Sequence, residues 1–354
     1  MGAAVALHNA FCRRSYAAHC AIPWKPRQQK TGAQRLQAVN RSQLTQAGLE
    51  CWLILTTARR QAVNDIRRVG VIGAGLMGSG IAEVCARSGL DVVVAEVSAP
   101  AMEAGRARIA TSLDRAVRSG KLAEADRAAV DARMSFTVDL GDMNDRDLVV
   151  EAVAEDESVK TDLFARLDKI VARRDALLAS NTSSIPIIRL AMATSRAEQV
   201  IGIHFFNPVP VLPLVELIPS LLSSAETRER AAYFASKVLG KQVVQAQDRA
   251  GFVVNALLIP YLLSAIRMLE SGFATAEDID NGMVLGCAHP MGPLRLADLI
   301  GLDTTKAVAD SMYAEFKEPL YAPPPLLLRM VDAGRYGKKS GRGFYDYSRA
   351  ELPD

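Results

Sequence analysis

The sequence predicts an α/β fold in which a Rossmann-type, mostly parallel sheet domain is followed by an all-helical C-terminal domain. From about residue 65, short apolar runs alternate with helical stretches, which is typical of a parallel sheet covered on both faces. A glycine motif separates the first run from the first helix, and no strand is expected after Asp248. These observations place the two domains at residues 65–249 and 250–354, after a leader at residues 1–64.

The leader is basic and shows no clear hydrophobic period. Residues 1–64 carry nine Lys or Arg and one acid, Glu50, whereas the other 290 residues carry 33 basic and 38 acidic side chains. This composition resembles an organellar transit peptide, and a start codon assigned too far upstream would give a similar non-native extension. The pI of 8.6 therefore reflects the leader and does not predict nucleic-acid binding. We expect a disordered leader and a cytoplasmic bacterial protein, with organellar import if the transit peptide is genuine.

The sheet domain is expected to begin with buried parallel strands, because strands covered on both faces are almost continuously apolar. The expected strands are Val69–Ile72, Val92–Ala95, Leu148–Val153, Ala176–Ala179 and Val200–Ile203, with Leu214–Ile218 and Gln242–Gln245 completing the sheet. The helices expected between them are Leu76–Ser88, Ala99–Ser119, Ala123–Arg133 and Ser158–Ala172.

The C-terminal domain is expected to contain helices at Gly251–Glu270, Ala276–Gly286, Asp303–Phe316 and Pro324–Ala333. Its longest apolar stretch, Val253–Ile266, is interrupted by Asn255, Pro260 and Ser264, so it predicts a buried helix and not a membrane span. Cys85 and Cys287 are the only cysteines after the leader and belong to no Cys/His cluster, which predicts a reduced compartment and no structural metal.

The glycine motif is Gly73-Ala74-Gly75-Leu76-Met77-Gly78, directly between a predicted strand and a predicted helix. Gly73 would permit the tight turn, Gly75 would let the backbone approach a pyrophosphate, and Gly78 would let helix and strand pack closely. The helix N-terminus at Leu76 and Met77 would then face the phosphates. The motif alone is weak evidence, because an ordinary glycine-rich turn has the same pattern.

Glu96 strengthens the dinucleotide interpretation. It ends the second predicted strand, 23 residues after Gly73, where a carboxylate binds the ribose hydroxyls. A carboxylate there would repel the 2′-phosphate of NADP, so NAD is the favoured cofactor. The alternative is that Glu96 is a solvated acid at a strand end.

A candidate catalytic pair follows at the end of another strand. His204 ends an apolar run, prolines then return the chain, and Glu216 lies on the next apolar run. A lone histidine on an apolar strand is more often a core residue, but a buried Glu216 would be costly without a partner. A histidine held by a glutamate is a general base near neutral pH. A third strand is followed by Asn181–Ser184, which offers amide and hydroxyl donors at the same edge of the sheet. The alternative is that this segment caps a helix.

Together these residues resemble the L-3-hydroxyacyl-CoA dehydrogenase family, and within it the short-chain 3-hydroxybutyryl-CoA dehydrogenases of actinobacteria. The similar segments run in the family's order from about Arg67 to Tyr347: GAGLMGSGIA, EAVAEDESVK, ASNTSS, HFFNPVPVLPLVE, DRAGFVVNALL, HPMGPLRLADLIGLD and GKKSGRGFYDY. The resemblance implies an NAD-dependent oxidoreductase that reversibly oxidises the 3-hydroxyl of a 3-hydroxyacyl-CoA in fatty acid or butanoate metabolism. It also implies a homodimer and an acyl-CoA substrate, with no nucleic-acid or membrane partner.

The resemblance also implies individual roles. His204 matches the catalytic base, Glu216 the acid that orients it, Ser183 the serine that bonds the substrate oxygen, and Asn255 the asparagine that completes the site. The implied NAD contacts are Glu155, Lys160, Asn181 and Lys339. In the animal members a serine and a lysine seven residues apart contact CoA. Here Ser112 matches the serine, Ser119 occupies the lysine position, and Lys121 lies close enough in the sequence to substitute.

Two other functions share part of this pattern. A β-hydroxyacid dehydrogenase of the 6-phosphogluconate type would carry a catalytic lysine on the helix that opens its second domain, but residues 251–263 contain Asn255 and no lysine. A non-catalytic NAD-binding protein of the same fold would have no need of the His204–Glu216 pair.

Overall fold

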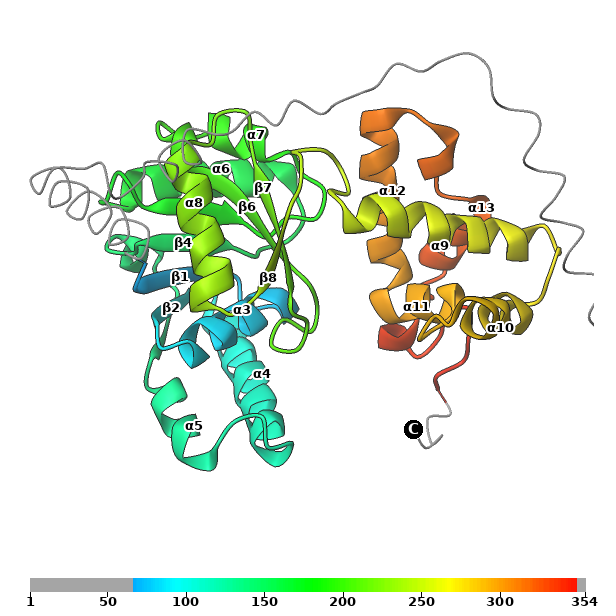
Figure 1. The fold of residues 1–354 in the computed structure, drawn as a ribbon, viewed down its shortest axis with the longest axis horizontal. Helices are drawn as coiled ribbons and strands as arrows, with labels where there is room; N and C mark the ends of the chain where they lie inside the picture. The colour runs from blue at the N-terminus through cyan, green and yellow to red at the C-terminus, as the bar shows by residue number, and fades with distance from the viewer. Residues whose placement is uncertain (1–65, 349–354) are drawn as a thin grey trace, which may run out of the picture. The chain divides into compact units, whose positions relative to one another are not determined.

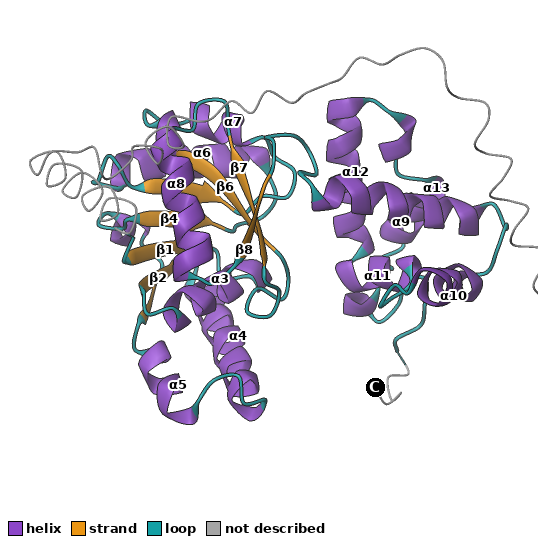
Figure 2. Cartoon of the chain, in the orientation of Figure 1, coloured by secondary structure: helices purple, strands orange, loops and turns teal. Residues whose placement is uncertain are grey.

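The computed structural model describes residues 66–348 (Figure 1). The predicted leader lies outside the described residues. Within them the predicted fold class is confirmed, because a mostly parallel sheet with helices is followed by a region built from helices (Figure 2). No helix in residues 66–348 is long and apolar enough to cross a membrane.

The sheet has eight strands in the order β3-β2-β1-β4-β5-β6-β7-β8. The first six strands in that order pair in parallel, β7 runs antiparallel to β6, and β8 pairs in parallel with β7. The strands are β1 Arg68–Ile72, β2 Asp91–Ala95, β3 Met134–Thr137, β4 Leu148–Glu151, β5 Leu177–Ser180, β6 Val200–Phe205, β7 Leu214–Pro219 and β8 Gln242–Gln245. The carboxyl ends of β1, β2, β4, β5 and β6 therefore share one edge, where ligands bind in open α/β sheets.

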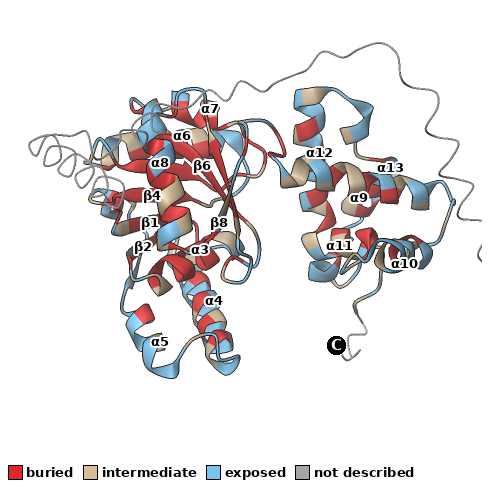
Figure 3. Cartoon of the chain, in the orientation of Figure 1, coloured by how far each residue is buried: buried red, intermediate tan, exposed pale blue. Residues whose placement is uncertain are grey.

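Helices cover both faces of this sheet (Figure 3). Successive side chains of a strand point to opposite faces, so Val92 and Val94 join one core while Val93 and Ala95 join the other. Helices α3 (Leu76–Arg87), α4 (Ala99–Arg118) and α8 (Ala225–Tyr233) cover the first face, and α6 (Glu157–Ile170) and α7 (Ile187–Met192) cover the second. A short helix, α5 (Glu124–Asp131), connects α4 to β3.

The helical region has its own core. It comprises α9 (Val254–Glu270), α10 (Ala276–Cys287), α11 (Pro293–Ile300), α12 (Leu302–Phe316) and α13 (Pro325–Asp332). Leu262, Leu263 and Ile266 of α9 pack with Leu294 of α11 and Met312 of α12. α9 is thus the central helix of this region as well as the first element after the sheet.

The structure adds elements that the sequence pattern did not predict. Strand β3 and helices α7, α8 and α11 were missed because each has nine residues or fewer, too short to establish a period. The helix expected from Gly251 begins instead at Val254, because Gly251 and Phe252 have positive φ angles of 82° and 47°. Left-handed residues cannot belong to a right-handed helix.

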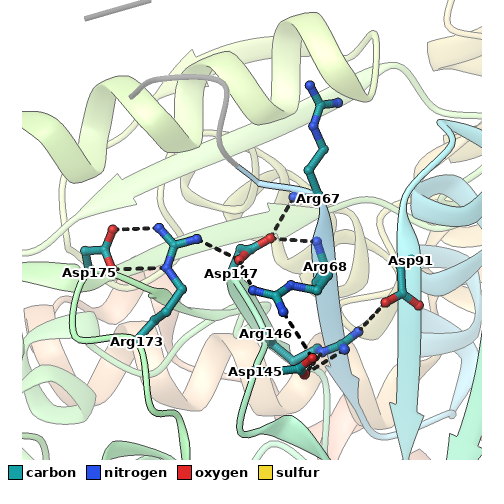
Figure 4. A network of polar contacts seen from close by, with 8 residues as sticks. All are labelled: Arg67, Arg68, Asp91, Asp145, Arg146, Asp147, Arg173 and Asp175. Atoms are coloured by element: carbon teal, nitrogen blue, oxygen red, sulfur yellow. Dashed lines mark hydrogen bonds and ion pairs between the residues drawn. The ribbon is translucent and has the colours of Figure 1, made fainter. Parts of the chain in front are cut away.

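An ion-pair network joins the amino ends of β1, β2 and β4, opposite the ligand-binding edge (Figure 4). Asp147 accepts hydrogen bonds from the backbone amides of Arg67 and Arg68 at 2.9 and 2.8 Å, and its other oxygen pairs with the guanidinium groups of Arg68 and Arg173. Burial alone would raise the pKa of Asp147, but these donors outweigh it and hold the pKa below its ordinary value. This network therefore joins the amino ends of three neighbouring strands.

Candidate functional site

The glycine turn after β1 has the geometry that a bound pyrophosphate requires. Gly73 has a φ of 92°, and a Cβ on Gly78 would lie 1.8 Å from the carbonyl oxygen of Gly73. A Cβ on Gly75, in contrast, would meet nothing within 4 Å. The N-terminus of α3 has no capping side chain, so its first amides can be donors to an anion. The chain therefore packs tightly at Gly73 and Gly78 and leaves open space at Gly75.

Glu96 lies against this turn and is not a freely solvated acid. Its carboxylate accepts hydrogen bonds from the amides of Ala74 at 2.6 Å and Val97 at 3.0 Å. These bonds hold a negative charge at the end of β2 beside the open space at Gly75. That is the position from which a carboxylate can accept hydrogen bonds from ribose hydroxyls.

The loop after β4 and the loop after β5 are joined by Glu155. One oxygen of Glu155 accepts bonds from the Thr182 hydroxyl, the amides of Ser183 and Ser184, and the Ser184 hydroxyl. Its other oxygen lies 2.6 Å from Lys160 Nζ. The helix-cap interpretation of these residues is not needed, because the carboxylate of Asp248 accepts from the first amides of α7.

Two carboxylates share the Lys160 ammonium group. Lys160 is 1% exposed and also lies 3.2 Å from Glu151, a fully buried residue at the end of β4. Burial raises the pKa of Glu151, against the opposing effects of Lys160 and the Ser180 hydroxyl. Burial would also raise the pKa of Glu155, but Lys160 and the donors from Thr182 and Ser183 lower it below its ordinary value. Glu155 therefore remains charged at neutral pH.

His204 and Glu216 are directly opposite each other on antiparallel strands β6 and β7. The imidazole Nδ1 lies 2.8 Å from Glu216 Oε2, and both side chains are buried. A carboxylate oxygen accepts hydrogen bonds, so this contact favours the neutral tautomer with the proton on Nδ1 and the lone pair on Nε2. Nε2 lies 3.2 Å from the hydroxyl of Ser183. The structure therefore brings together a base, the residue that orients it and a neighbouring hydroxyl group.

Glu216 is also attached to the helical region. Its second oxygen, Oε1, accepts hydrogen bonds from the amides of Val253 at 3.0 Å and Val254 at 2.8 Å, at the start of α9. No sequence pattern predicts this contact, since every residue except proline supplies a backbone amide. Asn255 follows on the same helix, half-buried, with no hydrogen bond to its side-chain amide in the described structure.

A cavity of about 330 Å³ is lined by four of the ten predicted cofactor residues. Its wall includes Met77 of the glycine turn and Val153 after β4. The predicted polar residues on its wall are Glu155, Lys160, Asn181 and Ser183. Asn181 accepts a hydrogen bond from the Phe205 amide through Oδ1, so its NH₂ group is free to donate into the cavity.

Lys339 is not on the wall of this cavity, although its partner is. Its ammonium group lies 2.7 Å from Asp303 of α12, which lines the cavity. The loop that carries Lys339 is anchored by Asp298 of α11, which accepts from the amides of Phe344 and Tyr345 at 3.0 Å. Lys339 is therefore at the margin of the cofactor cavity.

A second, larger cavity of about 670 Å³ lies between α3, α4 and the loop after β6. Of the three predicted CoA residues, Ser112 lines it, whereas Ser119 and Lys121 do not. Ser119 ends α4, and its hydroxyl donates to the Ala116 carbonyl. The cations on the cavity wall are Arg108 and Arg115, which sequence reasoning missed. Their seven-residue spacing around Ser112 was a usable signal, since these positions share one face of a helix.

Comparison with known proteins agrees with this geometry. The sequence profile of the 3-hydroxyacyl-CoA dehydrogenase NAD binding domain matches residues 68–249, and that of the C-terminal domain of the same family matches residues 251–347. A 3-hydroxybutyryl-CoA dehydrogenase of Mycobacterium tuberculosis is 62% identical over 80% of this chain and 99% of its own. The mitochondrial hydroxyacyl-coenzyme A dehydrogenase of Sus scrofa is 43% identical over 80% of this chain and 91% of its own.

Solved structures give the same result. The crystal structure of M. tuberculosis FadB2 superposes with a TM-score of 0.79 at 62% identity, covering 80% of this chain and 99% of that one. The structure of (S)-3-hydroxybutyryl-CoA dehydrogenase PaaH1 from Ralstonia eutropha superposes with a TM-score of 0.76 at 48% identity, covering 80% of this chain and all of that one.

Proposed function

Since the chain belongs to the 3-hydroxyacyl-CoA dehydrogenase family, we propose that it interconverts 3-hydroxybutyryl-CoA and acetoacetyl-CoA at the His204–Glu216 pair. The protein is an NAD-dependent oxidoreductase that acts on the CH–OH group of 3-hydroxyacyl-CoA substrates. The observation that carries the residue assignment is the pair itself: a buried imidazole whose Nδ1 lies 2.8 Å from a carboxylate and whose Nε2 lies 3.2 Å from the Ser183 hydroxyl.

The residues around the pair have distinct roles in the proposed mechanism. His204 Nε2 removes the proton of the 3-hydroxyl, and Glu216 stabilises the imidazolium ion that forms. The Ser183 hydroxyl and the Asn255 amide hold the substrate oxygen. In the reverse direction the imidazolium ion returns the proton to the oxygen of acetoacetyl-CoA. A positioned base of this kind contributes about 10²–10⁴-fold to the rate.

The residues on the cofactor side fit a dinucleotide. Gly75 leaves space for the pyrophosphate, and Glu96 would accept from the ribose hydroxyls. Glu155, Lys160 and Asn181 line a cavity whose wall also includes Ser183, the residue whose hydroxyl contacts His204. The chemistry that bound NAD would supply is a hydride acceptor for C3 of the substrate. Glu96→Ala is expected to narrow the preference for NADH over NADPH, and an equal or higher kcat/KM for NADPH in the native enzyme would contradict the role of Glu96.

We propose the larger cavity as the site of the CoA moiety, with Ser112, Arg108 and Arg115 on its wall. Arg108 already donates to the Ala74 carbonyl at 2.7 Å, so Arg115 is the better candidate for a phosphate. Arg115→Ala is expected to raise KM for acetoacetyl-CoA about tenfold, the value of one charge-assisted hydrogen bond. It should leave KM for acetoacetyl-pantetheine unchanged, because that substrate has no phosphate group. Arg118→Ala, on the same helix but outside the cavity wall, is the matched control.

The function is tested by turnover of acetoacetyl-CoA with NADH. His204→Ala should bind NADH normally and lose most of its turnover, whereas near-normal kcat in this variant would refute the assignment. Kinetics with 3-ketoacyl-CoAs of increasing chain length tests the short-chain preference. Absence of turnover in the native protein, with NADH binding intact, would favour the non-catalytic alternative.

We also propose a homodimer formed through the helical region. Leu257 of α9 is 76% exposed, Phe273 is 79% exposed and Leu285 of α10 is 83% exposed. Large apolar side chains exposed in this number on neighbouring helices indicate a surface that another protein covers. The cytoplasmic location stays a prediction from the sequence.

A further inference from the structure

We propose that Phe252 is a positioning residue for the catalytic pair, and that it acts through the left-handed backbone turn that it forms with Gly251. The inference rests on the proposed function, since it concerns the same His204–Glu216 pair. It adds a role for a residue that makes no polar contact with the site and that no motif had singled out for chemistry.

The backbone of Phe252 is unusual in a way that helix capping does not explain. Among residues 66–348, Phe252, Ala288 and Lys317 are the non-glycine residues with positive φ. Ala288 and Lys317 are the residues at which α10 and α12 end, where a left-handed residue is common. Phe252 instead precedes a helix, and it follows Gly251, whose φ is also positive at 82°. Two consecutive left-handed residues reverse the chain immediately before α9.

This reversal aims the start of α9 at Glu216. The next two amides, those of Val253 and Val254, both donate to Glu216 Oε1, while Oε2 faces His204 Nδ1. A carboxylate that accepts from two amides at a helix N-terminus is held in place by charge-assisted hydrogen bonds. One oxygen of the Glu216 carboxylate therefore binds the backbone amides after the turn, and the other binds the imidazole.

The side chain of Phe252 contributes separately. It is 8% exposed, and its ring lies edge-on to the His204 imidazole with 5.5 Å between centroids. The ring of Phe206 lies near the same imidazole at 4.6 Å. The two aromatic rings restrict rotation of the imidazole, so a test must separate the effect of the ring from the effect of the turn.

Three variants make that separation. Phe252→Gly and Phe252→Ala both remove the ring, but only glycine adopts a positive φ without strain. Phe252→Val is the strongest perturbation, because a β-branched residue with positive φ is a genuine outlier. Ala288→Val places the same strain at an exposed residue that ends another helix, α10, and is the control.

The turn should matter more than the ring. We expect Phe252→Gly to keep a higher kcat than Phe252→Ala, and Phe252→Val to lose about 10²-fold, the cost of a small misplacement of a catalytic group. Ala288→Val should keep kcat, even where its melting temperature falls as far as that of Phe252→Val. The Kd for NADH should be unchanged in all four variants, because none of these residues lies on the wall of the cofactor cavity.

A second measurement needs no substrate. The ¹⁵N chemical shifts of the His204 imidazole report which ring nitrogen carries the proton, and the signal is assigned by its loss in His204→Gln. We expect a proton on Nδ1 in the native protein and in Phe252→Gly, and a shift of the proton toward Nε2 in Phe252→Ala. Should Phe252→Val be insoluble, the alanine and glycine variants carry the comparison alone.

Equal impairment of the alanine and glycine variants, with the same tautomer in both, would overturn the proposal and leave only a packing role for the ring. A native protein that does not turn over acetoacetyl-CoA would instead refute the proposed function. In that case the tautomer comparison would still decide the role of Phe252.

Discussion

Replacement of Glu216 by glutamine should reverse the imidazole tautomer and so remove the catalytic base without disturbing the fold. In the native structure Glu216 Oε1 accepts from the amides of Val253 and Val254, and Oε2 accepts from His204 Nδ1. A glutamine has only one acceptor oxygen. We expect that oxygen to remain with the two amides, which places the NH₂ group against Nδ1.

The size of the effect follows from the bonds that would have to break. An NH₂ group facing Nδ1 requires an unprotonated Nδ1, so the proton moves to Nε2 and the base is lost. Turning the glutamine round would leave two buried amides without an acceptor, at a cost of about 1–3 kcal/mol each. A total of about 2–6 kcal/mol corresponds to a correct tautomer populated at about 10⁻² to 10⁻⁴. The expected fall in kcat is therefore about 10²–10⁴-fold.

The assay is steady-state reduction of acetoacetyl-CoA by NADH, alongside thermal unfolding and NADH binding. Glu216→Gln should bind NADH normally and unfold near the native temperature, because both amides keep an acceptor. Glu216→Ala should show the opposite ranking of the two measurements. Without a side chain that imposes the wrong tautomer, its kcat should exceed that of Glu216→Gln. Its melting temperature should be lower, because the two amides lose their acceptor. A glutamine variant within about tenfold of native kcat, less than one positioned base contributes, would refute the reasoning.

Three further predictions concern other parts of the chain. Gly78→Ala should lower the free energy of unfolding by about 1–3 kcal/mol and abolish NADH binding, because its Cβ would lie 1.8 Å from a backbone oxygen. Gly75→Ala should fold normally and weaken only NADH binding, because its Cβ would meet nothing within 4 Å. Asp147→Asn should lower the melting temperature at neutral pH. The folded pKa of Asp147 lies below its unfolded value. The difference in melting temperature between Asp147→Asn and the native protein should therefore have its full size above about pH 4 and disappear as the pH falls through the folded pKa. Sedimentation should show a dimer for the native chain and a monomer for Leu257→Asp, and a native monomer at micromolar concentration would contradict the predicted interface.

The parts of the fold that the sequence predicted are those in which local pattern and tertiary burial agree. The strands β1, β4 and β6 are buried almost throughout and mostly apolar because helices cover both faces, and their carboxyl ends could be assigned to one edge from connectivity alone. Strand β3 is different, since its residues are only partly buried at the edge of the sheet. Such a strand has little apolar signal, and only its pairing with β2 defines it.

The site divides in the same way. His204 and Glu216 could be paired from sequence because a proline-rich return between consecutive strands places them opposite each other. The CoA residues were harder to predict, because Ser119 was chosen by its resemblance to a family position and Lys121 by its closeness in the sequence, and neither by helix face. The structure places Arg108 and Arg115 on the cavity wall, on the helix face of Ser112.

The contact between Glu216 and the start of α9 lies beyond any sequence pattern, and it has a consequence for how the two regions depend on each other. The donors are backbone amides, so a substitution at Val253 or Val254 leaves both donors in place. The identity of these two side chains therefore carries no information about the hydrogen bonds. What the chain must preserve is the path of the backbone, which Gly251 and Phe252 set. The first helix of the helical region thus completes a catalytic pair whose side chains both belong to the sheet. A displacement of α9 would therefore move Glu216 and change the orientation of the His204 imidazole, even with every side chain of the site unchanged.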